Sequence, residues 1–398
     1  MAGPTTLMSS SGDRERFPDA GDLVRVIRCD GAPEAVWELD AALHAVRNGG
    51  EAVAPLGSEQ PPPPRDPGPG QVVVTTSGST GQPKWVQLSA AALAASAAAA
   101  HARLGGPGRW LLALPGQHVA GLQVLIRAAL AGSRPAVLDV RGGFDPAAFA
   151  AAARQLARQA GGRCYTALVP TQLARLLETD PESLTGFDAV LLGGAAAPDR
   201  LLRQARTAGV RVVTTYGMTE TAGGCVYDGW PLDGTRVRVD GEGNIELAGP
   251  MLATGYLDAP EETAATFRDG WFRTSDLGRL DAQGRLQVLD RADDVVVTGG
   301  LNVAPADVEA VLTGLPGVAA ACVVGLPDPE WGEQVTAVVV PADPGRPPDP
   351  AALRAAARRL LTGAQAPKEI VLFDALPLCG VGKPDRGAVR AMLTARAR

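Results

Sequence analysis

Residues 165–217, YTALVPTQLARLLETDPESLTGFDAVLLGGAAAPDRLLRQARTAGVRVVTTYG, decide the fold. Three short β-favouring runs (YTALVP, DAVLLGG and VRVVTTYG) alternate there with two helical patterns (TQLARLLE and PDRLLRQARTAG). This alternation is typical of parallel strands that are covered by helices on both faces of a sheet. Ligands in such folds bind at the carboxyl ends of the strands, so the sequence predicts a binding site there.

The same alternation begins upstream, where VVVTT precedes an Ala-rich helix from about Ser89, WLLALP precedes VAGLQVLIRAALAG, and PAVLDV precedes PAAFAAAARQLARQ. Residues 57–70, GSEQPPPPRDPGPG, cannot sustain a helix or a central strand, because proline lacks a backbone donor and fixes φ. We expect them to connect a short N-terminal piece to the main domain.

Beyond Gly224 short strands with turn signals predict a β-rich subdomain, and from about Val295 helix and strand patterns predict a small α+β domain. The expected fold class is α/β. A large N-terminal domain with a doubly wound parallel sheet and the β-rich subdomain would span residues 1–290. A hinge at 291–294 would connect it to a small mobile C-terminal α+β domain at 295–398.

Composition excludes several classes of protein. The 398 residues carry 37 Lys+Arg and 43 Asp+Glu, a net charge of −6 without a block of like charges, which disfavours nucleic-acid and anionic-membrane surfaces. The five cysteines lie far apart without a CxxC pair, so we expect reduced, mostly buried thiols rather than a metal site. The N-terminus lacks the apolar core of a signal peptide, and the Ala-rich run near residues 90–100 is too short to span a bilayer, so a cytoplasmic protein is expected.

Residues 75–84, TTSGSTGQPK, gather hydroxyls and glycines into one turn after an apolar strand. Backbone N–H and hydroxyl donors of such a loop can surround phosphate oxygens, and Lys84 can add a positive charge. The loop is not a Walker P-loop, because Gln82 and Pro83 separate Lys84 from the second glycine. Taken alone, it fits a solvated turn equally well.

TSGSTGQPK resembles the signature loop of the adenylate-forming superfamily of acyl-CoA synthetases, peptide-synthetase adenylation domains and luciferases. Five further motifs follow in the family's order: GGAAAP at 193–198, TYGMTE at 215–220, WFRTSDLG at 271–278, DRADDVVVTGGLNVAPADVE at 290–309 and GKPDR at 382–386. The resemblance covers the chain from about Val72 onward, and the ordered set is highly specific. It implies that a carboxylic acid reacts with ATP to give an acyl-AMP and then with coenzyme A to give a thioester, with Mg²⁺ as cofactor.

The resemblance also implies roles for single residues around ATP. The β- and γ-phosphates would be held by Thr76, Ser77, Gly78, Ser79, Thr80, Gly81 and Lys84. The nucleoside would be bordered by Gly194, Ala195, Thr215, Tyr216, Gly217, Asp276 and Arg291, with Tyr216 against the purine and Asp276 on the ribose hydroxyls. Thr219 would reach the α-phosphate, and Glu220 would bind Mg²⁺, a hard cation that prefers oxygen ligands.

Lys383 is expected to carry the first step. Attack of a carboxylate on the α-phosphorus brings two anions together, so a cation placed between them lowers the barrier. For the second step, the resemblance implies that the small domain turns about Asp293, withdraws Lys383 and presents Gly299 and Gly300 to the pantetheine arm of coenzyme A. A dry channel would favour attack of the thiolate on the mixed anhydride.

His118 lies at a strand-to-helix junction in LPGQHVAGLQVLIRAALAG, residues 114–132. A lone histidine more often caps or packs, but the family commonly places an aromatic residue or histidine at the floor of the acyl pocket. We expect His118 to act there, with Gln117, Gly193 and Thr221 as further substrate contacts. This segment and the short chain resemble o-succinylbenzoate-CoA ligases of menaquinone synthesis. That acid carries a second carboxylate, which requires hydrogen-bond donors in an otherwise apolar pocket.

Three alternatives stay open. One is a CoA ligase for another aryl or medium-chain acid. A peptide-synthetase adenylation domain is disfavoured, because no acidic residue for an amino group follows the GGA-type strand and no carrier segment follows Lys383. A non-catalytic nucleotide-binding protein is disfavoured because the polar residues that the chemistry needs are intact: Lys84, Glu220, Asp276, Arg291 and Lys383. The expected partners are the acid, ATP and coenzyme A, in a monomer or homodimer.

Overall fold

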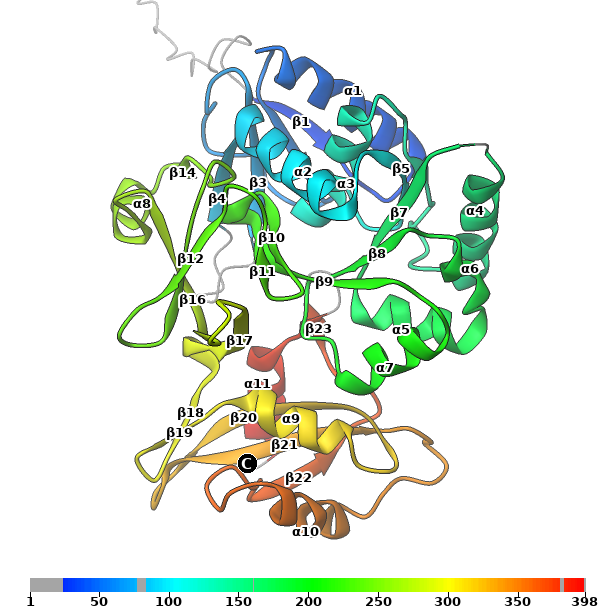
Figure 1. The fold of residues 1–398 in the computed structure, drawn as a ribbon. Coiled ribbons are helices and arrows are strands. Elements are labelled where there is room, and N and C mark those ends of the chain that lie inside the picture. The colour runs from blue at the N-terminus through cyan, green and yellow to red at the C-terminus, as the bar shows by residue number, and fades with distance from the viewer. Residues whose placement is uncertain (1–23, 77–83, 160, 380–382, 397–398) are drawn as a thin grey trace, which may run out of the picture.

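The computed structural model describes residues 24–76, 84–159, 161–379 and 383–396 and shows a large lobe above a small one (Figure 1). The first sheet of the large lobe has the order β1-β2-β3-β4-β14. Its strands are β1 (Arg25–Arg28), β2 (Val53–Leu56), β3 (Gln71–Thr76), β4 (Lys84–Ser89) and β14 (Gly255–Tyr256), with α1 (Pro33–Arg47) between β1 and β2.

Two sequence expectations about this region are corrected. The N-terminal piece is part of the first sheet, since β1, β2 and β3 are parallel, so residues 57–70 connect two strands of one sheet. A strand also intervenes between VVVTT and the Ala-rich helix: β4 pairs antiparallel with β3, and Thr76 lies opposite Lys84. KWVQLS alternates partly buried and buried side chains, the period of a strand. The expected phosphate loop therefore joins the two strands of a hairpin.

A second sheet, of order β11-β10-β9-β8-β7-β5-β6, forms the centre of the large lobe. Its strands are β5 (Gly108–Leu112), β6 (Ala136–Val137), β7 (Arg163–Leu168), β8 (Ala189–Leu192), β9 (Val212–Met218), β10 (Gly223–Tyr227) and β11 (Trp230–Pro231). Strands β5 to β9 are parallel, and β10 and β11 are added antiparallel. Its helices are α2 (Ala90–Leu104), α3 (Val119–Leu130), α4 (Pro146–Arg158), α5 (Pro170–Thr179), α6 (Glu182–Thr185) and α7 (Asp199–Thr207).

Helices cover both faces of this sheet, as the sequence predicts (Figure 1). Along β5, Trp110 and Leu112 belong to the core shared with α1, α2 and α3, whereas Leu111 belongs to the core shared with α4 to α7. Side chains of a strand alternate between the two faces of a sheet, so one strand contributes to both cores. The doubly wound sheet is confirmed.

The β-rich subdomain and α8 complete the large lobe. Its elements are β12 (Arg236–Val239), β13 (Asn244–Ala248), α8 (Pro260–Thr266), β15 (Phe267–Arg268), β16 (Trp271–Leu280) and β17 (Leu286–Arg291). The strands form one antiparallel sheet with its own buried cluster, which includes Ile245, Leu247 and Phe272. Residues of β9 and β10 pack on the same cluster, so the subdomain is fixed against the central sheet.

The small lobe begins after a short 3₁₀ turn, η2 (Ala292–Asp294). Its elements are β18 (Val296–Thr298), β19 (Leu301–Val303), α9 (Pro305–Thr313), β20 (Val318–Asp328), β21 (Gly332–Pro341), α10 (Pro350–Leu360), β22 (Glu369–Leu372), β23 (Leu378–Cys379), β24 (Lys383–Pro384) and α11 (Arg386–Arg396). Its two buried clusters draw only on positions 296–393. This separate core supports our proposal that 291–294 is the boundary between two domains.

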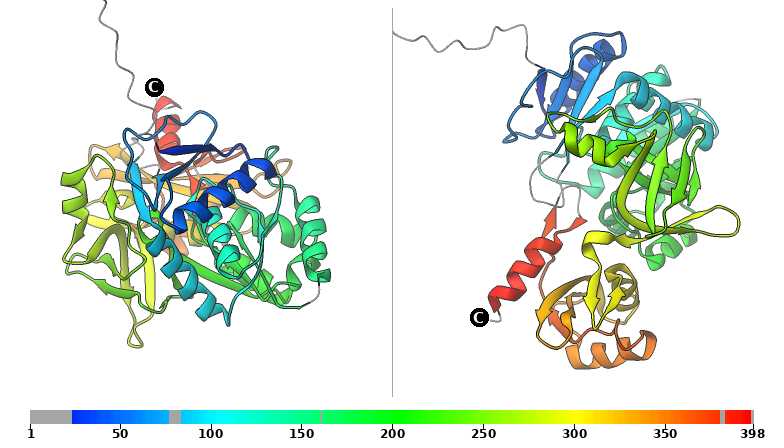
Figure 2. Two further views of the ribbon diagram at one scale, coloured as in Figure 1. Left: turned by 90° about the horizontal axis from the view of Figure 1, so that it is seen from above. Right: turned by 90° about the vertical axis from the view of Figure 1, so that its left-hand side faces the viewer.

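The junction of the lobes is polar. Asp290 Oδ2 accepts a hydrogen bond from the backbone N of Ala306 at 2.9 Å. Arg386 forms an ion pair with Glu309 at 3.0 Å and a longer one with Asp294 at 3.5 Å. The hairpin of β23 and β24, which includes the backbone of Lys383, projects from the small lobe toward the large one (Figures 1 and 2).

Arg386→Met is expected to lower the free energy of unfolding of the small domain by roughly 3 kcal/mol, because it leaves two partly buried carboxylates without their cation. Burial already raises the pKa of Glu309, and Arg386 opposes that shift. Urea unfolding can be followed by fluorescence of Trp331, the only tryptophan of residues 295–398. The exposed Arg390→Met on the same helix is the matched control. Equal unfolding midpoints for both variants would contradict the role of Arg386.

Candidate active site

The TYGMTE motif ends β9 and turns into the one-turn helix η1 (Thr219–Thr221). Thr221 stabilises this turn: its Oγ1 accepts a hydrogen bond from Met218 N at 2.9 Å and donates to Gly223 O at 2.8 Å. Thr221 is fully buried and its hydroxyl is used within the turn, so it holds the shape of the turn. The turn places the buried Thr219 and Glu220 at the carboxyl end of a parallel strand.

Three predicted nucleotide-binding residues meet beside β9. Tyr216 Oη donates a hydrogen bond to Asp276 Oδ2 at 2.8 Å. Asp276 on β16 lies opposite Arg291 on β17, and Arg291 Nε is 3.9 Å from Asp276 Oδ1. Burial raises the pKa of Tyr216 far above its usual range and the charge of Asp276 adds to the effect, so the phenol remains a donor. Ser275 Oγ accepts a long hydrogen bond from Arg291 Nη2 at 3.5 Å.

A second group surrounds Glu220. Tyr256, on β14, donates its hydroxyl to Glu220 Oε1 at 3.0 Å. Lys84 Nζ lies 5.2 Å from the centroid of the Tyr256 ring, within the range of a cation–π interaction. The same ammonium forms an ion pair with Glu262 of α8. The structure thus brings Lys84 and Glu220 to one tyrosine, with the ammonium over its ring and the carboxylate at its hydroxyl.

Charges from both groups of residues act on the carboxylate of Glu220. Burial raises the pKa of Glu220, and the Tyr256 hydroxyl, Lys84 and Arg291 oppose this shift. Among the described residues, no group of three or more His, Cys, Asp or Glu side chains could hold a metal ion. Mg²⁺ needs no such group, because it is commonly bound by one or two carboxylates together with substrate phosphates and water. A single buried carboxylate beside a phosphate site fits this mode of binding.

The GGAAAP segment leaves β8 close to β9. A Cβ on Gly193 would lie 2.3 Å from Thr215 Oγ1, and that hydroxyl donates to Leu192 O at 3.3 Å. Gly194 has φ of +81°, a conformation that favours glycine. Positions 193 and 194 therefore require glycine, and Gly193 lies against Thr215, next to the residues where the sequence predicts the adenine.

The expected acyl side lies along α3. His118 is the N-cap residue of α3, and burial lowers its pKa, which favours the neutral imidazole. Gln117 Oε1 is buried and has no hydrogen-bond partner among the described residues. Gln123, one turn into the helix, donates to Ala222 O at 2.7 Å. The helix that begins at His118 is thereby fixed to the turn that carries Glu220.

Sequence reasoning missed a buried arginine on this helix. Arg127 is 3% exposed, its guanidinium lies 5.2 Å from the centroid of the Trp110 ring, and Nη2 donates to Tyr227 Oη at 3.3 Å. Its Nε has no hydrogen-bond partner, and no carboxylate forms an ion pair with it in the part of the chain that the structure describes. A buried charge without a counter-ion is costly, so Arg127 is a candidate for a functional role. The polar residue inside the apolar run VLIRAAL was the available signal.

Other predicted residues lie at the edges of this site or beyond the described residues. Residues 77–83, which include Ser77 to Gly81, and the side chains of Asp293 and Lys383 lie outside what the structure describes. Gly299 and Gly300 connect β18 to β19 with φ of +57° and +77°. A Cβ on Gly299 would lie 2.8 Å from the Trp331 ring, so this turn requires glycine.

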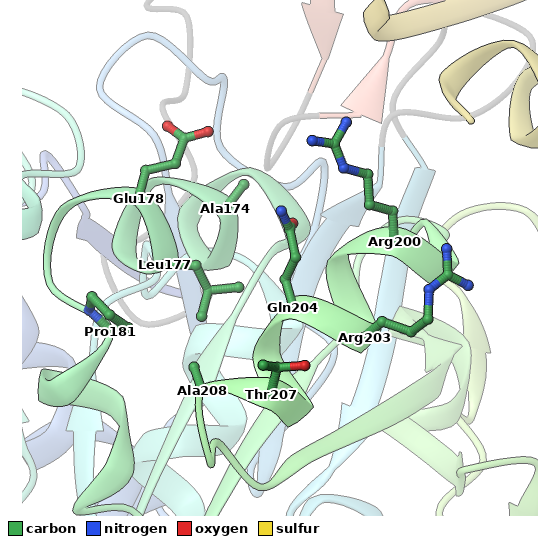
Figure 3. A pocket seen from close by; sticks show the side chains of 9 residues that line it. All are labelled: Ala174, Leu177, Glu178, Pro181, Arg200, Arg203, Gln204, Thr207 and Ala208. Atoms are coloured by element: carbon green, nitrogen blue, oxygen red, sulfur yellow. The ribbon is translucent and has the colours of Figure 1, made fainter. Parts of the chain in front are cut away.

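A groove of about 440 Å³ between α5 and α7 lies apart from these residues (Figure 3). Arg200 and Arg203 project along one side of it, and Glu178 lies across from them (Figure 3). No residue of the groove is among those that the sequence predicts for the site, and the chemistry described above does not involve it.

The residues that the sequence assigns to nucleotide binding lie together at the carboxyl end of β9, as expected of an enzyme that activates its substrate with a nucleotide. The sequence profile of AMP-binding enzymes matches residues 8–257, and that of the AMP-binding enzyme C-terminal domain matches residues 307–383. The chain belongs to the AMP-binding enzyme family.

Several similar proteins of this family act on, or are named for, the same acid. The chain is 50% identical over 323 residues to a probable 2-succinylbenzoate–CoA ligase of Mycobacterium tuberculosis (strain H37Rv), covering 80% of this chain and 83% of that protein. It also resembles the o-succinylbenzoate CoA synthetase of Bacillus subtilis in complex with its acyl-adenylate intermediate, with a TM-score of 0.77, 26% identity and coverage of 93% and 88%. The same Bacillus subtilis enzyme with ATP and a magnesium ion gives a TM-score of 0.74, 25% identity and coverage of 92% and 89%.

Proposed function

We propose that the protein is an o-succinylbenzoate-CoA ligase of menaquinone biosynthesis. It converts o-succinylbenzoate, ATP and coenzyme A into o-succinylbenzoyl-CoA, AMP and pyrophosphate through an acyl-adenylate. The observation that carries the proposal is the convergence of Lys84, Tyr216, Glu220, Asp276 and Arg291 around the carboxyl end of β9. The 50% identity to a probable 2-succinylbenzoate–CoA ligase supports the choice of acid.

In the first step the acyl carboxylate attacks the α-phosphorus of ATP and pyrophosphate leaves. Lys84 and the β3–β4 loop would hold the β- and γ-phosphates, and Asp276 would accept from the ribose hydroxyls. Glu220 would hold Mg²⁺, which supplies positive charge to the phosphates. Thr219 would reach the α-phosphate, and Lys383 would neutralise the charge that develops between the acyl oxygen and the α-phosphate.

In the second step the thiolate of coenzyme A attacks the acyl carbon, and AMP leaves with the electron pair of the cleaved bond. We propose that the small domain turns about Asp293, so that Lys383 withdraws and the turn at Gly299 and Gly300 borders the pantetheine channel. The contact between Asp290 and Ala306 at the junction supports a lobe that can turn there, because a polar contact of this kind can be exchanged for hydrogen bonds with water. The partners are then the small-molecule substrates, and the proposed location is the cytoplasm, where both ATP and coenzyme A are available.

The carboxylate that is not activated requires hydrogen-bond donors, and a cation provides the strongest ones. We propose that Arg127 supplies it, because its buried guanidinium has a free Nε and lies on the helix that His118 begins. The neighbouring rings of Trp110 and Tyr227 provide apolar walls around this charge. His118 and Gln117, at the other end of α3, would border the succinyl chain.

The wild-type enzyme is expected to form a thioester with o-succinylbenzoate far faster than with benzoate, cinnamate or hexanoate. Arg127→Met should lower kcat/KM for o-succinylbenzoate roughly a hundredfold, since removal of one partner from a buried charge pair costs about 2–5 kcal/mol. The same substitution should have little effect on the rates with benzoate, cinnamate and hexanoate, which have no second carboxylate. The measurement is CoA thioester formation with the four acids.

Arg134→Met, an exposed arginine just after α3, is the control for this experiment. Comparable wild-type rates with all four acids would remove the assignment of the substrate. An equal loss with every acid in Arg127→Met would make Arg127 a structural residue only.

A further inference from the structure

Lys84, the expected phosphate-binding cation, forms an ion pair with a carboxylate of its own protein. Its ammonium contacts Glu262 and lies over the Tyr256 ring. The Lys84 side chain is 27% exposed and that of Glu262 is 40% exposed, so the pair borders solvent. An anion that reaches Lys84 from solvent must compete with Glu262 for it.

The fold fixes Glu262 in this position. β14 pairs with β4, with Tyr256 opposite Val86, and α8 is the next element along the chain, three residues after β14. Thr263 Oγ1 accepts a hydrogen bond from Tyr256 N at 2.9 Å, which holds the start of α8 against β14. Glu262, next to Thr263, is therefore brought to the first residue of β4, which is Lys84.

We propose that Glu262 is a positioning residue that holds Lys84 on Tyr256 when no phosphate is bound and competes with the phosphates of ATP and pyrophosphate for its ammonium. The proposal rests on the proposed role of Lys84 in holding these phosphates. Glu262 thereby weakens the binding of both anions and hastens the release of pyrophosphate.

The expected effect follows from the exposure of the pair. Partly exposed ion pairs contribute modestly in water, so loss of this competitor should tighten the binding of ATP and pyrophosphate roughly three- to tenfold. Loss of a negative charge near a polyanion acts in the same direction. A purely structural role for Glu262 would instead weaken binding, because Lys84 would lose its fixed position.

The test measures the KM for ATP and the inhibition constant of pyrophosphate in acyl-AMP formation at saturating Mg²⁺. Glu262→Gln should lower both constants roughly three- to tenfold. Glu262→Asp should restore values near those of the wild type. Glu261→Gln, an exposed carboxylate one residue away on α8, should match the wild type within about twofold. Melting temperatures of all variants check that they are folded.

The inference is overturned if Glu262→Gln behaves like Glu261→Gln or binds ATP and pyrophosphate more weakly than the wild type. Lys84→Gln tests the proposed function separately, because it should weaken both ligands by itself. In the Lys84→Gln background, Glu262→Gln should have no further effect, since the competition needs the ammonium. If Lys84→Gln binds both ligands normally, the phosphate role of Lys84 fails and the inference fails with it.

Discussion

Lys383→Ala is expected to lower the rate of acyl-AMP formation roughly a thousandfold, because the approach of two anions would lose the cation that offsets their repulsion. Thioester formation from supplied acyl-AMP should stay within about threefold of the wild type, since the lysine is proposed to be withdrawn in that step. The hairpin of β23 and β24, which begins its second strand at Lys383, extends toward the large lobe (Figures 1 and 2). Pyrophosphate release measures the first half-reaction, and thioester formation from synthetic acyl-AMP measures the second.

Lys368→Ala provides the matched control for Lys383. Lys368 belongs to the same small domain, but its ammonium lies 4.2 Å from the centroid of the Trp331 ring, a different environment from the hairpin. This variant should form acyl-AMP at the wild-type rate. Equal loss of both half-reactions in Lys383→Ala would contradict the assigned role.

Glu220→Gln is expected to lower acyl-AMP formation by a few hundredfold, on the order of the loss seen when one preorganised electrostatic group is removed. The amide keeps the shape of the side chain and can still accept from Tyr256, which donates to Oε1 at 3.0 Å. Only the charge that would hold Mg²⁺ is removed. The measurement is the dependence of the pyrophosphate release rate on Mg²⁺ concentration, which should shift to higher concentrations.

Glu246→Gln is a suitable control for Glu220. Glu246 pairs with Arg238 on the β-rich subdomain, so its loss should leave the Mg²⁺ dependence unchanged. An unchanged Mg²⁺ dependence in Glu220→Gln as well would show that Glu220 is not the metal ligand.

Much of the fold could be predicted because its signals are local. The period of apolar residues indicated the helices and strands of the doubly wound sheet and of the small domain, and the structure confirms them. The partner of each strand carries no such signal. VVVTT has the same apolar pattern whichever sheet it joins, so a helix was predicted directly after it, whereas it pairs with β4 in a separate sheet.

The active site was likewise predictable only in its local parts. Its motifs are contiguous, and backbone donors, glycine conformations and turn hydroxyls act within a few residues, so the sequence indicated TYGMTE and GGAAAP as sites. The contacts of Tyr216 with Asp276 and of Tyr256 with Glu220 join residues far apart in the chain.

The sequence by itself determined the class of chemistry, because residue type and spacing fix which groups a short segment can present. Only the tertiary structure decided that Lys84 forms an ion pair with Glu262 and that Arg127, among the described residues, is buried without a carboxylate partner. The physical reason is that charge interactions and desolvation depend on distance and burial in space. Neither the distance between two charges nor their burial can be recognised from a repeat or a spacing of residues along the chain.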